Sequence, residues 1–170
     1  MLIRAIHKAI ALLRKRYNKR WSGDLSNQRG NRGIDKMKNP TNQEIHYTET
    51  DMTAWRWKNF TPKEIASKGD GLLMVNEDAM DALQTFREMV GVAFTPNSAY
   101  RSVAHNKAVG GSPNSMHLQG RAFDIPIKSG MSRMAIHKFA KQAGFTGFGD
   151  YDTFVHIDTG RSRYWDMRKS

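Results

Sequence analysis

The sequence contains no cysteine and no apolar run long enough to span a membrane. Without cysteine, the 170-residue chain is not a disulfide-stapled scaffold, a cysteine-zinc protein or a thiol enzyme. No apolar run approaches the roughly 18 to 20 residues that a spanning helix needs. Apolar residues make up 39% and charged residues 25% of the chain, a composition typical of one globular domain with an appendage.

Acidic residues are scarce in the first part of the chain. The formal net charge is +11, and residues 1–40 contain 11 Lys and Arg against 2 Asp and Glu. The body, residues 41–170, has 16 basic and 14 acidic side chains and is nearly balanced. A nucleic-acid-binding domain carries its positive charge on the folded surface. We therefore expect no specific nucleic-acid partner, and DNA binding through residues 1–40 is a minor third hypothesis.

The first residues have a helical hydrophobic pattern with basic residues between the apolar ones. This pattern over residues 2–13 predicts a basic amphipathic N-terminal segment, residues 1–20. Its longest uncharged apolar stretch, Ala9–Leu13, is too short for a standard signal peptide, so we expect synthesis in the cytoplasm. Residues 1–40 are expected either to contact an anionic membrane or wall polymer, or to form a solvated extension.

The remainder divides into a polar region, residues 21–54, and a folded domain, residues 55–170. The polar region has no sustained hydrophobic period and is expected to be a linker or irregular chain. In the domain, capping residues and apolar spacing predict helices and strands. The helices are expected at 62–67, 77–90 and 133–143, and the strands at 93–98, 122–127 and 154–158. This mixture predicts an α+β fold with a small antiparallel sheet packed with helices.

Three polar residues stand in places where packing alone does not explain them. Asp124 interrupts an apolar strand, and an unpaired carboxylate there costs several kcal/mol unless a cation or donors satisfy it. His117 precedes it by seven residues, and His156 lies in the middle of another predicted strand. Two imidazoles and one carboxylate suit zinc and leave a fourth position for water. The alternative is an ordinary His–Asp pair.

Four segments of the domain extend this set into a recognisable pattern. They are Ser98–Ser102 (SAYRS), His105–His117 (HNKAVGGSPNSMH), Gly120–Asp124 (GRAFD) and Phe154–Gly160 (FVHIDTG). Their order resembles the zinc D-alanyl-D-alanine peptidase family, which includes D-Ala-D-Ala carboxypeptidases and phage L-alanyl-D-glutamate endopeptidases. The resemblance covers about residues 57–166. It implies the fold shared with the hedgehog signalling domain, with the zinc site on the sheet.

The resemblance also implies roles for individual residues. His117, Asp124 and His156 would bind one Zn²⁺ per chain. Arg101 would stabilise the polarised carbonyl or bind the substrate carboxylate, because both tasks suit a fixed, forked positive charge. Ser115 would orient the peptide substrate, with capping of its loop as the alternative.

The general base departs from the pattern of the better-known members. They have Glu or Asp three residues before the second histidine, where this chain has Thr153. Asp152 would lie roughly 13 Å from His156 along a straight strand, and Asp158 about 6 to 7 Å from it on the same face. We favour Asp152 as the base and Asp158 as a partner that fixes a histidine. A metal site with weak catalysis is the third possibility.

The sequence thus predicts a zinc-dependent peptidase that hydrolyses peptidoglycan stem peptides or cross-links, as a D,D-carboxypeptidase or endopeptidase. Its small size and the absence of a standard signal peptide favour a phage-type cell-wall lysis enzyme that acts as a monomer. The alternative is a non-catalytic, metal-containing module that binds the cell wall.

Overall fold

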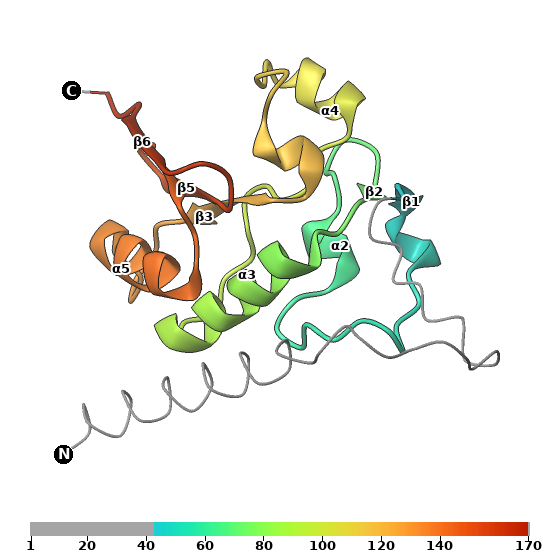
Figure 1. The fold of residues 1–170 in the computed structure, drawn as a ribbon, viewed down its shortest axis with the longest axis horizontal. Coiled ribbons are helices and arrows are strands. Elements are labelled where there is room, and N and C mark those ends of the chain that lie inside the picture. Colours follow the sequence, from blue (N-terminus) through green and yellow to red (C-terminus); the bar gives the residue numbers. More distant parts are fainter. Residues whose placement is uncertain (1–42, 170) are drawn as a thin grey trace, which may run out of the picture. The chain divides into compact units, whose positions relative to one another are not determined.

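The computed structural model describes residues 43–169, which form an α+β fold of helices and two small sheets (Figure 1). The expected amphipathic segment, residues 1–20, and most of the expected polar region lie outside the described residues. Along the chain the elements are β1 (Ile45–His46), η1 (Tyr47–Glu49), α2 (Pro62–Ile65), β2 (Leu72–Leu73), α3 (Glu77–Val90), α4 (Val103–Ala108), η2 (Met116–Gln119), β3 (Ala122–Pro126), α5 (Arg133–Ala143), β4 (Gly147–Asp150), β5 (Phe154–Asp158) and β6 (Arg163–Asp166).

The capping residues predicted from the sequence cap helices in the structure. Thr61 and Glu64 form the expected capping box of α2, which ends two residues earlier than predicted. Asn76 caps α3, and Gly91 ends that helix in the left-handed region with φ 68°. Helix α5 begins after Ser132, whose side chain accepts a hydrogen bond from the backbone N–H of Ala135. These predicted helices are confirmed.

The larger sheet has the strand order β3-β5-β4-β6. Strands β3 and β4 both pair antiparallel with β5, and β6 pairs with β4 in parallel. The predicted small antiparallel sheet is thus present in β3, β5 and β4, and β6 adds a parallel strand at one edge. Two rows of residues cross the four strands in register: Asp124, His156, Gly149 and Trp165 form one, and Ala122, Asp158, Gly147 and Arg163 form the other.

The two faces of the sheet carry different kinds of side chain because successive side chains point to opposite faces along each strand. One face carries the apolar residues of β3 and β5, and helices α3 and α5 lie on the same side of the domain in Figure 1. This core includes Leu83, Phe86, Phe123, Ile125, Ile136, Val155 and Ile157, all fully buried. The opposite face carries both cross-strand rows, so the polar residues of interest share one surface.

The predicted strand over 93–98 is wrong. The segment runs beside the edge of β3, but only Ser98 forms a bridge, with Asp124. Two backbone hydrogen bonds join them there: Asn97 N–H to the Asp124 carbonyl and Asp124 N–H to the Ser98 carbonyl, both 2.8 Å. Pro96 has no N–H to extend the ladder, which explains why a strand does not form.

The sequence predicts that the folded unit begins at Trp55. In the structure, packed residues precede this position. Ile45 and His46 form β1, which pairs antiparallel with β2, and the Tyr47 ring packs against the core. The hydroxyl of Tyr100 donates a hydrogen bond to Glu44. Residues 45–47 are therefore part of the folded unit, whereas residues 51–54 are exposed. Among residues 43–169, no helix has the length and apolar character to cross a bilayer.

Candidate metal centre

Three elements bring His117, Asp124 and His156 together. His117 lies in η2, a single turn that Ser115 caps by accepting a hydrogen bond from the His117 N–H (3.3 Å). Asp124 and His156 are paired residues of β3 and β5, so their side chains leave the same face of the sheet side by side. One side-chain atom of each residue lies within 4.8 Å of the other two, and all three residues are buried.

The distances between these atoms are short. The Nδ1 atom of His156 lies 2.9 Å from Oδ1 of Asp124, and Nε2 of His117 lies 3.2 Å from both of them. The predicted convergence of these three residues on one point is thus present in the structure.

The hydrogen bonds at the far side of each ring decide which nitrogens face this point. The Nδ1 atom of His117 lies against the carbonyl oxygen of Ala99, which can only accept, so Nδ1 carries the proton. The Nε2 atom of His156 lies 3.1 Å from Oδ2 of Asp158, a carboxylate oxygen, so here Nε2 donates. When the rings are neutral, two bare nitrogens and one carboxylate oxygen therefore face one another. Three acceptors at such distances repel one another unless a proton or a metal ion lies between them.

The charges of the three residues respond to this arrangement. Burial alone would raise the pKa of Asp124, but hydrogen bonding with His117 and His156 outweighs it and lowers that pKa. Burial lowers the pKa of His117. For His156, burial is outweighed by hydrogen bonds to Asp124 and Asp158, which raise its pKa. Protons and a metal ion therefore compete for the same place, and metal uptake falls as the pH falls.

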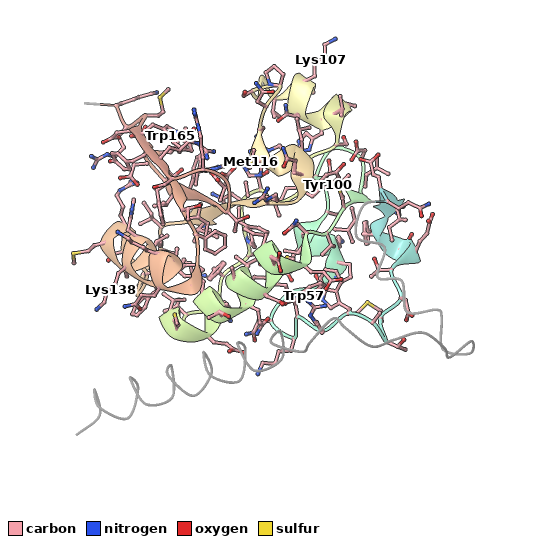
Figure 2. The ribbon with its side chains drawn as sticks, viewed as in Figure 1. Trp57, Tyr100, Lys107, Met116, Lys138 and Trp165 are labelled. Carbon is pink, nitrogen blue, oxygen red and sulfur yellow. The ribbon has the colours of Figure 1, made fainter. Side chains whose placement is uncertain are left out.

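A cavity of about 850 Å³ opens over these residues and has few acidic groups. Its single carboxylate is Asp124. Met116 and Trp165, both labelled in Figure 2, also line it. The other lining residues are Arg101, Val109, Gly110, Gly111, Ser112, Asn114, Ser115, His117, Tyr151, Phe154, His156, Arg161 and Arg163. A peptide-sized ligand would thus meet a basic and aromatic wall beside the candidate metal ligands.

Comparison with known proteins identifies the family to which this chain belongs. The model of the peptidase M15 family matches residues 43–158. The chain belongs to the peptidase M15 family. Over 89 residues it is 34% identical to the zinc D-Ala-D-Ala carboxypeptidase of Streptomyces albus G, which covers 49% of this chain and 34% of that protein. Over 75 residues it is 37% identical to the peptidoglycan L,D-endopeptidase MepK of Escherichia coli K12, covering 40% and 41%.

These alignments leave much of the relatives unmatched. The M15 chain spans about a third to two fifths of the length of the two curated proteins. The family assignment itself rests on the match to residues 43–158, which contain all three candidate metal ligands.

Asp158 of this M15 domain lies on the same sheet face as His156, but it is fully buried and does not line the cavity. Besides His156, its carboxylate accepts hydrogen bonds from the N–H of Gly160 (2.7 Å) and from both Nη atoms of Arg163 (2.7 and 3.1 Å). Burial would raise its pKa, but the hydrogen bonds from His156 and Gly160 outweigh burial and lower it. Asp158 thus has the contacts of a residue that orients His156, the second of the two roles considered for it.

Asp152, favoured as the base from the sequence, is not brought to the site. It is exposed, does not line the cavity, and its Oδ1 accepts a hydrogen bond from the N–H of Lys169 (3.0 Å). The β4–β5 pairing is regular up to Asp150 and Val155, and the N–H of Tyr151 donates to the carbonyl of Phe154 (3.1 Å). Thr153 is also exposed and outside the cavity lining.

Arg101 and Ser115, for which the family resemblance implies roles in substrate binding, both line the cavity. The Arg101 guanidinium donates through Nη2 to Oδ2 of Asp124 and through Nε to the hydroxyl of Ser98, each at 2.7 Å. Arg101 therefore fixes the oxygen of Asp124 that the histidines do not use. The hydroxyl of Ser115 caps η2, which is the structural alternative considered for it.

Several residues of the cavity wall are not among those that the sequence predicts. The sequence predicts no role in the site for Trp165, yet the ring centroids of Trp165 and His156 lie 5.1 Å apart, and Nε1 of Trp165 donates to the Tyr151 hydroxyl (3.2 Å). Tyr151 stacks on Phe154 with ring centroids 4.3 Å apart. Arg161 was not singled out either. Alternation along β6 could have placed Arg163 and Trp165 on one face, but that strand was not predicted.

Proposed function

We propose that this chain is a zinc-dependent peptidase that hydrolyses peptide bonds of bacterial peptidoglycan. The observation that carries the proposal is the convergence of Nε2 of His117, Oδ1 of Asp124 and Nδ1 of His156 at the cavity, in a chain of the peptidase M15 family. A His₂Asp set of three protein ligands with an open fourth position is the arrangement of catalytic rather than structural zinc.

The surrounding residues have distinct proposed tasks. When bound, zinc supplies the Lewis acidity that polarises a peptide carbonyl and makes water a nucleophile at neutral pH. Arg101 holds Asp124 through Nη2. Within residues 43–169 its Nη1 donors form no hydrogen bond, so they are available to a substrate oxygen. Asp158 and Arg163 hold the ring of His156 in its orientation.

The substrate proposal is supported by the names of the relatives. One acts on D-Ala-D-Ala and the other is a peptidoglycan L,D-endopeptidase, so both are named for wall peptides. The cavity is large enough for several residues of a stem peptide. We also propose that the domain has the fold shared with the hedgehog signalling domain, on the strength of the family alone.

A non-catalytic module that binds wall peptide is the second candidate function. The observation that favours it is the cavity lining, in which Asp124 is the only carboxylate and Thr153 takes no part. Catalysis by Asp152 would require the β4–β5 turn to move, since Asp152 lies outside the lining.

One experiment separates these two functions. Zinc content and digestion of purified peptidoglycan are measured for the wild type and for His117→Ala, with His46→Ala as a matched control outside the site. We expect one zinc per chain in the wild type and the control, and new peptide ends that mass spectrometry identifies. His117→Ala should lose zinc and turnover together. Zinc binding without any cleavage would establish the binding module instead.

The role of residues 1–40 is a separate proposal, supported by their excess of basic residues. We propose that they hold the enzyme near anionic wall polymers or a membrane surface during phage-type lysis, with the domain acting as a monomer. Deleting residues 1–40 should then weaken wall binding in low salt. Unchanged binding and lysis after this deletion would overturn the proposal.

A further inference from the structure

Three arginines line the cavity, and the structure gives two of them a carboxylate partner. Arg101 pairs with Asp124 at 2.7 Å, and Arg163 pairs with the buried Asp158 at 2.7 Å. Arg161 is exposed, and within residues 43–169 it has no carboxylate within ion-pair distance. It is therefore the cavity arginine whose charge no described residue offsets.

The backbone that carries Arg161 is held firmly. The N–H of Gly160 donates to Asp158 (2.7 Å), and the Arg163 guanidinium donates to the carbonyl of Arg161 (3.1 Å). Arg121 donates to the carbonyl of Thr159 (2.7 Å). The ion pair that orients His156 therefore also fixes the turn from which Arg161 extends.

The same turn packs close to the metal ligands. A Cβ atom added at Gly160 would lie 3.0 Å from the sulfur of Met116, the residue before His117. The turn thus leaves no room for a side chain at position 160 and lies beside η2. Arg161 lines the same cavity as His117, Asp124 and His156.

We infer that Arg161 binds a free carboxylate of the peptide substrate, an inference that rests on the proposed peptidase function. A guanidinium without a carboxylate partner suits an incoming carboxylate because its donors match the two oxygens of that group. With Asp124 as the only carboxylate in the lining, the cavity favours anionic over neutral peptides. The carboxylate comes either from the C-terminus of the peptide or from an acidic residue within it.

The test uses the zinc-loaded full chain and three synthetic wall stem peptides. The first has all its carboxylates free, the second is amidated at its C-terminus, and the third is amidated at its internal D-Glu. We measure kcat and KM where cleavage occurs, and Kd by calorimetry in every case. The wild type should prefer the free peptide over one of the two amidated peptides by about tenfold, the range of a hydrogen-bonded charge. The amidated peptide that loses affinity identifies the source of the carboxylate.

Arg161→Gln should abolish this preference. The variant should raise KM or Kd for the free peptide about tenfold without changing kcat. For the amidated peptide that the wild type binds more weakly, KM and Kd should stay unchanged. Arg161→Lys should retain part of the preference, because lysine keeps the positive charge but lacks the paired N–H donors of the guanidinium. Arg168→Gln is the matched control: this exposed arginine pairs with Asp166 outside the cavity lining and should change nothing.

The outcomes separate this inference from the proposed function. A wild type that binds or cleaves all three peptides alike overturns the role of Arg161, and so does a variant that weakens all of them equally. An Arg161-dependent preference in binding without cleavage of these peptides or of whole peptidoglycan supports the carboxylate site and rejects the peptidase. Binding of none of the three peptides rejects the carboxylate site, and digestion of whole peptidoglycan then decides the peptidase separately.

Discussion

At the scale of single residues, Asp158 acts on the metal centre through His156. Its buried carboxylate fixes the proton of that ring on Nε2 and so leaves Nδ1 free to bind a metal. Ligating histidines in proteins commonly have such a partner, and its loss typically lowers metal affinity 10- to 100-fold. Arg163 in turn holds Asp158 in place by pairing with both of its oxygens.

We predict that Asp158→Asn lowers zinc affinity by about 10- to 100-fold. An asparagine cannot neutralise Arg163, and its amide can present N–H instead of an acceptor to the ring of His156. The measurement is a competitive zinc titration against a chromophoric chelator at neutral pH.

Asp152→Asn is the matched control for this prediction. Its side chain is exposed and outside the cavity, so zinc affinity should stay at the wild-type value. Equal affinities for Asp158→Asn and the wild type would contradict the positioning role. Loss of turnover in Asp152→Asn with zinc retained would instead support Asp152 as the base.

The residues found from the sequence share one property. His117, Asp124 and His156 are polar in apolar or loop settings that packing does not explain, so local pattern and family resemblance both single them out. Trp165 and Arg161 have no such local signal, because aromatic and basic residues near a chain end are common. Their place at the cavity follows from strand pairing, which the sequence of a single chain does not show.

At the scale of elements, strand β4 makes room for the site by having no side chains on that face. Gly147 lies between Asp158 and Arg163 in its cross-strand row, and Gly149 lies between His156 and Trp165. A Cβ atom at Gly147 would come within 2.3 Å of the Asp158 carboxylate. The two glycines let these side chains lie across the strand.

Gly147→Ala is therefore predicted to lower zinc affinity at least tenfold, by pushing Asp158 away from His156. Asp158 cannot move freely, because Arg163 and the N–H of Gly160 hold it. The zinc titration used for Asp158→Asn measures this effect, and circular dichroism verifies that the variant is folded.

The control must separate zinc affinity from stability. Gly144 ends α5 with φ 111° and has open space around it, so Gly144→Ala costs roughly 1 to 2 kcal/mol of stability through backbone strain alone. Its zinc affinity should equal that of the wild type. If both alanine variants lose zinc to the same extent, the effect comes from general destabilisation and the close approach at Gly147 has no specific role.

Elements with capping residues at their ends could be predicted from the sequence, whereas elements without such residues could not. Helices α3 and α5 have capping residues, an apolar stripe and a terminal glycine, so their limits follow from local chemistry. Strand β4 reads Gly-Phe-Gly-Asp, a composition typical of a turn, and it becomes a strand because β5 and β6 pair with it on both sides. The segment 93–98 shows the reverse case, where Pro96 interrupts an apolar pattern.

At the scale of the whole molecule, the candidate metal centre joins parts of the domain that are distant in sequence. His117 comes from η2, Asp124 from β3 and His156 from β5, and Arg101 links β3 to the segment before α4. A cation bound by all three ligands would therefore stabilise the folded state against unfolding. The bound cation should therefore stabilise the fold in addition to its proposed role in catalysis.

Zinc removal is accordingly predicted to lower the melting temperature of the full chain. At a free zinc concentration of 1,000 times Kd, binding to the folded state alone contributes about 4.1 kcal/mol. For a chain of this size, each kcal/mol corresponds to about 2 to 4 °C, so the expected shift is about 8 to 16 °C. His117→Ala should melt at the same temperature with zinc and with a chelator, because it lacks one of the three ligands. A zinc-dependent shift of equal size in His117→Ala would mean that zinc binds elsewhere, and the three-residue centre would then not be the metal site of this domain.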